Sequence, residues 1–203
     1  MYGSRASVGL PVIFLGCLIA FLLGPAGSSA AGQTYPNTVE FWGGVAGWSG
    51  ENAQGFENGP STGATFLFHV GIPVQVGLDI AFARMDSDQI VGEVDEFSAS
   101  AAARYRLTLI PGFRPFLGLR GGYTRLSADY SDFRFEQNGS MIGGNAGLEI
   151  PLGSRVMLVA TAEAMHYTYR DTTIFLEDIP IPSTGGSAWR YWGRLGLAFR
   201  WGH

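Results

Sequence analysis

A strict two-residue alternation runs through the C-terminal segment, residues 189–201. Its odd positions read Trp, Tyr, Gly, Leu, Leu, Phe and Trp, whereas its even positions include Arg190, Arg194 and Arg200. Because successive side chains point to opposite faces of a β-strand, the pattern predicts a strand with one apolar, aromatic face and one arginine-bearing face. A soluble β-sandwich would pack the apolar face against a second sheet. A transmembrane β-barrel would turn it towards lipid and point the arginines into the lumen.

Seven other segments between residues 39 and 168 repeat this alternation and decide between the two folds. In each predicted strand the charges fall on the less apolar face. The charged residues of that face are Glu40, Asp79, Arg104, Arg106, Arg120, Glu149, Glu163, Arg190, Arg194 and Arg200. A soluble sandwich would expose these charges to water, and it would have no reason to place aromatic residues at both strand ends. The pattern therefore favours a barrel whose lumen is plugged by a network of ion pairs.

The first and seventh strands alternate less cleanly than the others. Requiring Glu40 and Glu163 to face the lumen sets their registers. This choice places Trp42, Val159 and Met165 inside the barrel and His166 outside it.

The connections between strands alternate in length. Short turns are predicted around Pro73, Pro111 and Pro151, because proline fixes φ and has no N–H to give to a ladder. Long polar stretches cover residues 49–62, 84–96, about 125–138 and 170–187. Glycine, at 30 residues, suits such a chain of strands and tight turns. The fold prediction is all-β: an eight-stranded antiparallel up-and-down transmembrane barrel with short periplasmic turns and long extracellular loops.

Aromatic residues on the apolar faces gather towards both strand ends. Those predicted near the long loops are Phe66, Phe82, Phe97, Tyr123, Trp189 and Tyr191, and those near the short turns are Phe41, Tyr105, Phe199 and Trp201. Two such bands are typical of the two lipid–water interfaces of a membrane barrel.

The first 31 residues are predicted to be a signal peptide. Arg5 provides a positive charge, residues 8–23 are mostly apolar, and Ser29 and Ala31 are small residues of a cleavage site after Ala31. Residues 32–38 then form a short periplasmic segment, and residues 39–203 form the barrel domain. Two alternatives are a lipoprotein signal acylated at Cys17 and an uncleaved anchor. The apolar run continues beyond Cys17, and it is short for a membrane-spanning helix.

The segment "RLGLAFRW", residues 194–201, resembles the C-terminal assembly signal of outer-membrane barrels. Its defined places are filled by Arg194, Gly196, Phe199 and Trp201, although Gly202 and His203 follow the last aromatic residue, where the usual chain ends. With the eight strands, residues 39–201 resemble the small OmpA-like and OmpX-like outer-membrane β-barrels. The resemblance implies a monomeric membrane anchor in the outer membrane of a Gram-negative-type bacterium. It also implies contact with outer-membrane lipids and lipopolysaccharide, insertion by the barrel assembly machinery, and a role in envelope integrity or adhesion.

The long connections are acidic. Thirteen acidic residues against four arginines give them a net charge of −9. Nucleic acid is therefore not an expected partner. The simplest role of this negative charge is to keep the loops soluble at the cell surface. Alternatives are that the loops bind surface ligands, or that divalent cations bridge them to lipopolysaccharide. No cofactor or metal site is predicted, since the segment 86–96 has its glycine at the seventh place and not at the sixth, as a calcium loop requires.

The sequence leaves two other functions as alternatives to the plugged anchor. A narrow channel for small or hydrophobic molecules would need an apolar lumen. The inward-facing residues that favour this hypothesis are Leu67, Val159 and Met165. An enzyme would rest on His166 and Thr168, which loosely resemble the outward-facing His-x-Ser site of lipid A deacylases, but threonine replaces the serine nucleophile. No catalytic residue is therefore predicted, and the protein is not expected to be an enzyme.

Overall fold

The computed structural model describes residues 37–49, 58–70, 73–87, 92–107, 112–130, 133–170, 172–176, 179–183 and 185–201. The predicted signal peptide, with Ser29, Ala31 and Cys17, lies outside the described residues. Among the described residues, no helix is long and apolar enough to cross a membrane.

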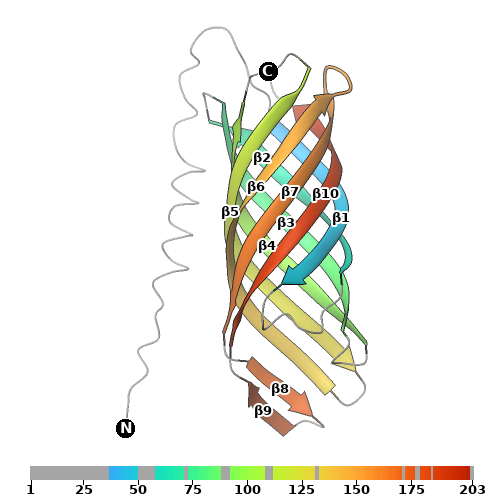
Figure 1. Ribbon diagram of the computed structural model, residues 1–203, viewed down its shortest axis with the longest axis vertical. Helices are drawn as coiled ribbons and strands as arrows, with labels where there is room; N and C mark the ends of the chain where they lie inside the picture. The colour runs from blue at the N-terminus through green and yellow to red at the C-terminus, as the bar shows by residue number, and fades with distance from the viewer. Residues whose placement is uncertain are drawn as a thin grey trace, which may run out of the picture. The chain divides into compact units, whose positions relative to one another are not determined.

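Eight long antiparallel strands close into a barrel (Figure 1). They are β1 (Asn37–Ser49), β2 (Gly59–His69), β3 (Val74–Ser87), β4 (Gly92–Arg106), β5 (Arg114–Tyr130), β6 (Phe133–Pro151), β7 (Val156–Tyr169) and β10 (Ser187–Trp201). Each pairs with its neighbours in chain order, and β1 pairs with β10, which closes the sheet. The predicted eight-stranded, antiparallel, all-β barrel is confirmed.

The predicted long connections contain more strand than their composition indicates. β3 reaches Ser87 and β4 begins at Gly92, so most of the stretch 84–96 is paired strand. A further hairpin, β8 (Thr172–Leu176) and β9 (Ile179–Ser183), pairs with the outer part of β6 (Figure 1). The prediction of loops over these residues was wrong in part. Strands that rise above an apolar band can carry polar residues on both faces, so composition does not mark their ends.

Inward and outward faces alternate as the sequence predicts. Along β10, buried and exposed residues alternate from Ser187 to Phe199. Trp42, Val159 and Met165 are 3%, 1% and 0% exposed, which confirms the registers of β1 and β7. The outer surface is apolar, with Leu119 at 69% exposure. The core of this protein therefore lies in the lumen.

Aromatic residues line both ends of the outer face. At the turn end, Phe41 and Phe199 have ring centroids 6.5 Å apart, and at the loop end Phe82 and Phe97 are 5.0 Å apart. Phe66 was wrongly predicted near the loops. It pairs with Val39, close to the start of β1, and so belongs to the turn end. Its face was readable from alternation, but its height depended on where β2 begins.

Glycines allow close approach at particular places in the wall. A Cβ on Gly44 would overlap the carbonyl oxygen of Gly193 on the neighbouring strand, whereas a Cβ on Gly193 would meet no atom within 4 Å. Gly112 lies in the turn before β5, and its φ of 85° is a conformation that favours glycine. Glycine is thus required for space at Gly44 and for backbone conformation at Gly112.

Candidate functional site

The middle of the lumen holds a ring of alternating charges. Arg120 on β5 donates from Nη1 to both carboxylate oxygens of Glu163 on β7, at 2.7 and 2.6 Å, and from Nη2 to Asp79 on β3. Arg194 on β10 donates to Asp79 at 3.1 Å and to Glu163 at 3.2 Å. All four residues are at most 7% exposed. Each arginine therefore joins the same two carboxylates across the barrel.

Neighbouring side chains fix this central ring in place. Thr65 Oγ1 donates to Asp79 Oδ2 at 2.6 Å, and Ser100 Oγ accepts from Arg120 at 3.0 Å. The guanidinium carbon of Arg194 lies 3.8 Å from the ring centroid of Trp42 and 3.9 Å from that of Trp192. These cation–π contacts cover the ions with aromatic surface and leave them little freedom.

A second charged layer lies towards the short turns. Arg104 donates to Glu40 at 3.0 Å and to Glu149 at 3.1 Å, and Arg106 donates to Glu149 at 2.9 Å. The Arg104 guanidinium also lies 3.9 Å from the ring centroid of Phe116. Together these groups fill the lumen below the central ring.

A third layer contains a residue that the sequence reasoning missed. Arg190 forms an ion pair with Glu96, and both are buried. Thr124 donates to Glu96 at 3.2 Å. The sequence pattern predicts Glu96 in a long loop, whereas the structure places it on β4. It has the same parity as Ser98 along β4, so continuing the alternation by one more step would have placed it in the lumen.

Arg200 faces the lumen but does not join an ion pair. Its Nε lies 3.0 Å from the sulfur of Met157, and no carboxylate of the described residues lies within 4 Å. Its predicted place in the ion-pair network was therefore wrong. Arg200 stands at the turn end of the lumen, where Glu149 Oε1 is already taken by Arg104 and Arg106.

Above the apolar band, charges pair on the exposed surface. Arg84 bonds to Asp95 at 2.9 Å and to Glu93 at 3.0 Å, and Arg125 contacts Glu136 at 2.7 Å. The hydrogen bond to Asp95, with the charges of Asp95 and Glu93, raises the pKa of the Arg84 guanidinium. These residues lie on extended strands and not in loops as predicted.

The remaining acidic residues of the predicted loops are only partly within the described structure. Those outside the described residues are Glu51, Glu57, Asp88, Asp132, Asp171, Glu177 and Asp178. In the part of the chain that the structure describes, no group of three or more His, Cys, Asp or Glu residues is arranged to hold a metal ion.

The residues of the enzyme hypothesis and of the predicted assembly signal lie in the barrel wall. His166 packs edge-on against Trp189, with ring centroids 5.1 Å apart, and Thr168 is exposed. Of the predicted assembly signal, Phe199 and Trp201 face outwards at 41% exposure each. Arg194 belongs to the central ring, and Gly196 is buried, where a Cβ would lie 2.8 Å from that of Trp42.

A closed barrel with an apolar, aromatic-banded exterior and a charged lumen defines the class of transmembrane β-barrels. The family model described as outer membrane protein beta-barrel domain matches residues 17–178, and the chain belongs to this family. The protein is accordingly located in the outer membrane of a Gram-negative bacterium. No curated protein matches the sequence.

Solved structures share the fold at low sequence identity. Neisserial surface protein A has a TM-score of 0.62 and 15% identity, over 81% of this chain and 97% of that protein. The outer membrane protein AlkL has a TM-score of 0.58 and 16% identity, over 87% and 95% of the two chains. OprG from Pseudomonas aeruginosa has a TM-score of 0.55 and 12% identity, over 83% and 97%. At these identities the similarity shows the fold alone.

Proposed function

We propose that this protein is a small, monomeric structural and surface-interaction protein, acting in envelope integrity or adhesion, with a lumen plugged by ion pairs. The observation that carries the proposal is the central ring, in which Arg120 and Arg194 each bond to both Asp79 and Glu163. Layers of charge above and below the ring add two further barriers. A solute crossing the lumen would have to separate these pairs.

The energy of such a separation supports a plug over a pore. Breaking one buried ion pair by removing a partner costs about 3 to 5 kcal/mol. The central ring contains four such contacts in one cross-section, so thermal opening of a continuous path is rare. If the lumen is closed, the protein acts through the contacts of its outer surfaces. No catalytic function is proposed.

The two exposed ends and the wall define the proposed partners. The apolar wall contacts outer-membrane lipids. The part of the protein above the wall carries the acidic residues of the long connections, and lipopolysaccharide surrounds this part. The aromatic C-terminal residues Phe199 and Trp201 are proposed contacts of the barrel assembly machinery. Acidic extracellular segments suit basic surface ligands and do not suit nucleic acid.

Planar bilayer recording tests the plug. Purified wild-type monomers should give no steady ion conductance, and Arg120→Glu, which places a third carboxylate in the central ring, should give brief openings. Arg84→Gln changes an exposed ion pair outside the lumen and serves as the control, with no openings expected. Steady conductance from the wild type would overturn the proposal and favour a channel.

A deletion strain tests the biological role. Loss of the gene should raise sensitivity to detergent if the protein supports the envelope, or lower attachment to surfaces if it acts in adhesion. Expression of the wild-type gene should restore either property. Unchanged detergent sensitivity and unchanged attachment would contradict both roles.

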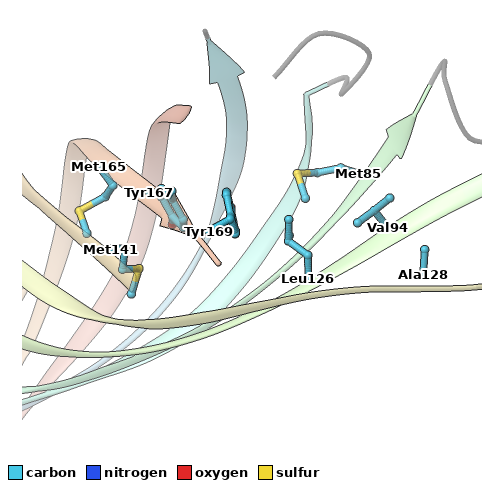
Figure 2. Close-up of a cluster of buried hydrophobic side chains, with 8 residues drawn as sticks. All are labelled: Met85, Val94, Leu126, Ala128, Met141, Met165, Tyr167 and Tyr169. Atoms are coloured by element: carbon cyan, nitrogen blue, oxygen red, sulfur yellow. The ribbon is translucent and has the colours of Figure 1, made fainter. Parts of the chain in front are cut away.

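One observation favours a second candidate, a narrow entry route for small hydrophobic molecules. Towards its loop end the lumen contains a cluster of buried apolar side chains, which Figure 2 shows. The buried side chains there are Met85, Val94, Leu126, Ala128, Met141, Met165, Tyr167 and Tyr169. Methionine adapts to varied apolar ligands. Faster uptake of an apolar dye into vesicles that contain the protein would support this route, and an unchanged rate would exclude it.

A further inference from the structure

The turn end of the lumen has more positive than negative charge. Four arginines lie there, Arg104, Arg106, Arg114 and Arg200, and the carboxylates among them are Glu40 and Glu149. We name these four arginines the turn-end cluster. Arg114 is on the same face of β5 as the buried Phe116, which places it on the lumen side of the wall. The central ring, by contrast, balances two arginines with two carboxylates.

Two members of the turn-end cluster have no carboxylate partner. Within the described residues, neither Arg114 nor Arg200 has a carboxylate oxygen within 4 Å. Arg114 lies opposite Glu149 in the strand register, but Glu149 Oε1 accepts from Arg104 and Arg106. Glu149 Oε2 has no hydrogen-bond partner among the described residues, yet whichever arginine turned to it, the excess of positive charge would remain.

The arginines of the cluster also repel one another. The charge of Arg114 opposes those of both Arg200 and Arg106, and that of Arg104 opposes Arg106, whereas Glu149 is the carboxylate whose charge favours both Arg106 and Arg200. Arg155 is exposed in the turn before β7, and its backbone lies beside that of Arg200 at the rim, because its carbonyl oxygen accepts from the Arg200 backbone N–H at 2.8 Å. Repulsion of this kind, close to a low-dielectric wall, favours the binding of an anion.

The sequence supplies no further acidic side chain to this end. Residues 1–39, 64–78, 101–118, 150–162 and 195–203 contain no Asp or Glu. The next carboxylates along the lumen, Asp79 and Glu163, are held in the central ring. Any anion that balances the cluster would therefore come from outside the set of acidic side chains.

The depth of the turn-end cluster relative to the membrane indicates which anions can reach it. The exposed aromatic residues Phe68, Tyr105, Phe199 and Trp201 mark the lipid–water interface at the turn end. Phosphate groups of phospholipids lie at that depth, and free phosphate reaches it from the periplasm. Guanidinium groups bind phosphate oxygens through paired, charge-assisted hydrogen bonds.

We propose that the turn-end mouth of the barrel is a phosphate-binding site, with Arg114 and Arg200 as its ligands and Arg155 at its rim. The phosphate is that of an anionic phospholipid headgroup or a free phosphate ion. Such a site anchors the periplasmic end of the barrel to its leaflet in the first case and senses a soluble anion in the second. The site is independent of whether the lumen conducts.

Two binding measurements on the full-length mature barrel distinguish the sources. Titration calorimetry in detergent uses inorganic phosphate, with chloride at equal ionic strength as the reference. Native mass spectrometry counts bound phosphatidylglycerol and phosphatidylcholine on barrels released from mixed nanodiscs. Binding of phosphatidylglycerol without inorganic phosphate supports the lipid source, and binding of inorganic phosphate supports the free anion. Binding of neither overturns the proposal.

Substitution then tests the residues. Arg114→Gln combined with Arg200→Gln should weaken binding by about a hundredfold or more, since each of the two lost charged hydrogen bonds lowers the affinity by roughly tenfold or more. The control Arg84→Gln, at the opposite end, should bind as the wild type does. If the double variant fails to fold, Arg155→Gln should still give a smaller loss. Equal affinity of the wild type and every folded variant would refute these assignments.

Discussion

Replacing Arg120 by methionine tests the central ring most directly. Arg120 donates to Asp79, Glu163 and Ser100, and its side chain is 2% exposed. In Arg120→Met, Arg194 alone faces two buried carboxylates, 3.1 and 3.2 Å away. Removing one partner of a buried ion pair costs about 3 to 5 kcal/mol, because a charge is left without compensation. We expect the free energy of unfolding to fall by that amount.

A second substitution separates lost charge balance from lost packing. In Arg120→Met combined with Glu163→Met, Arg194 keeps Asp79 as its single partner, so the ring is neutral again. Replacing a buried ion pair by apolar residues of similar volume is often close to neutral. The double variant should therefore recover most of the stability that Arg120→Met loses, although both changes remove hydrogen bonds.

Urea unfolding in lipid vesicles, followed by tryptophan fluorescence, measures these differences. Arg125→Gln is the control, because Arg125 pairs with Glu136 on the exposed surface, where such pairs contribute about 0–1 kcal/mol. The reasoning is refuted if Arg120→Met costs no more than Arg125→Gln. It is also refuted if the double variant is less stable than the single one.

Three further substitutions test the wall of the barrel. Gly44→Ala should destabilise by roughly 1–3 kcal/mol, because its Cβ would overlap a backbone carbonyl, whereas Gly193→Ala should not; equal unfolding curves would contradict this. Leu119→Arg should cost about 2–4 kcal/mol in bilayers if that residue faces lipid near the midplane, and a neutral effect there would contradict the assignment. Phe199→Ala with Trp201→Ala should reduce the heat-modifiable barrel recovered from cell membranes while refolding in detergent stays efficient. Equal recovery would remove the case for an assembly signal.

The sequence alone determined which way most side chains face. Alternation has a period of two in every strand, so a run such as residues 189–201 carries its own assignment of inside and outside. Charge on the inner face and aromatic residues on the outer face then distinguished a membrane barrel from a soluble sandwich. In the two strands that alternate less cleanly, the added requirement that Glu40 and Glu163 face the lumen placed Trp42 and Met165 correctly, without knowledge of the strand neighbours.

Tertiary structure decided which inward residues meet and at what height they lie. Arg120 and Glu163 come from strands that are not neighbours, and only the closure and stagger of the barrel bring them to one level. The same geometry places Glu96, which the sequence assigns to a loop, next to Arg190, and it places Arg200 beside Met157, with no carboxylate of the described residues within 4 Å. The two-residue periodicity specifies which face of the strand a residue occupies but not its height along the barrel axis, because all inward-facing residues of a strand fit the repeat equally well. Height is set by inter-strand hydrogen bonding over the whole sheet.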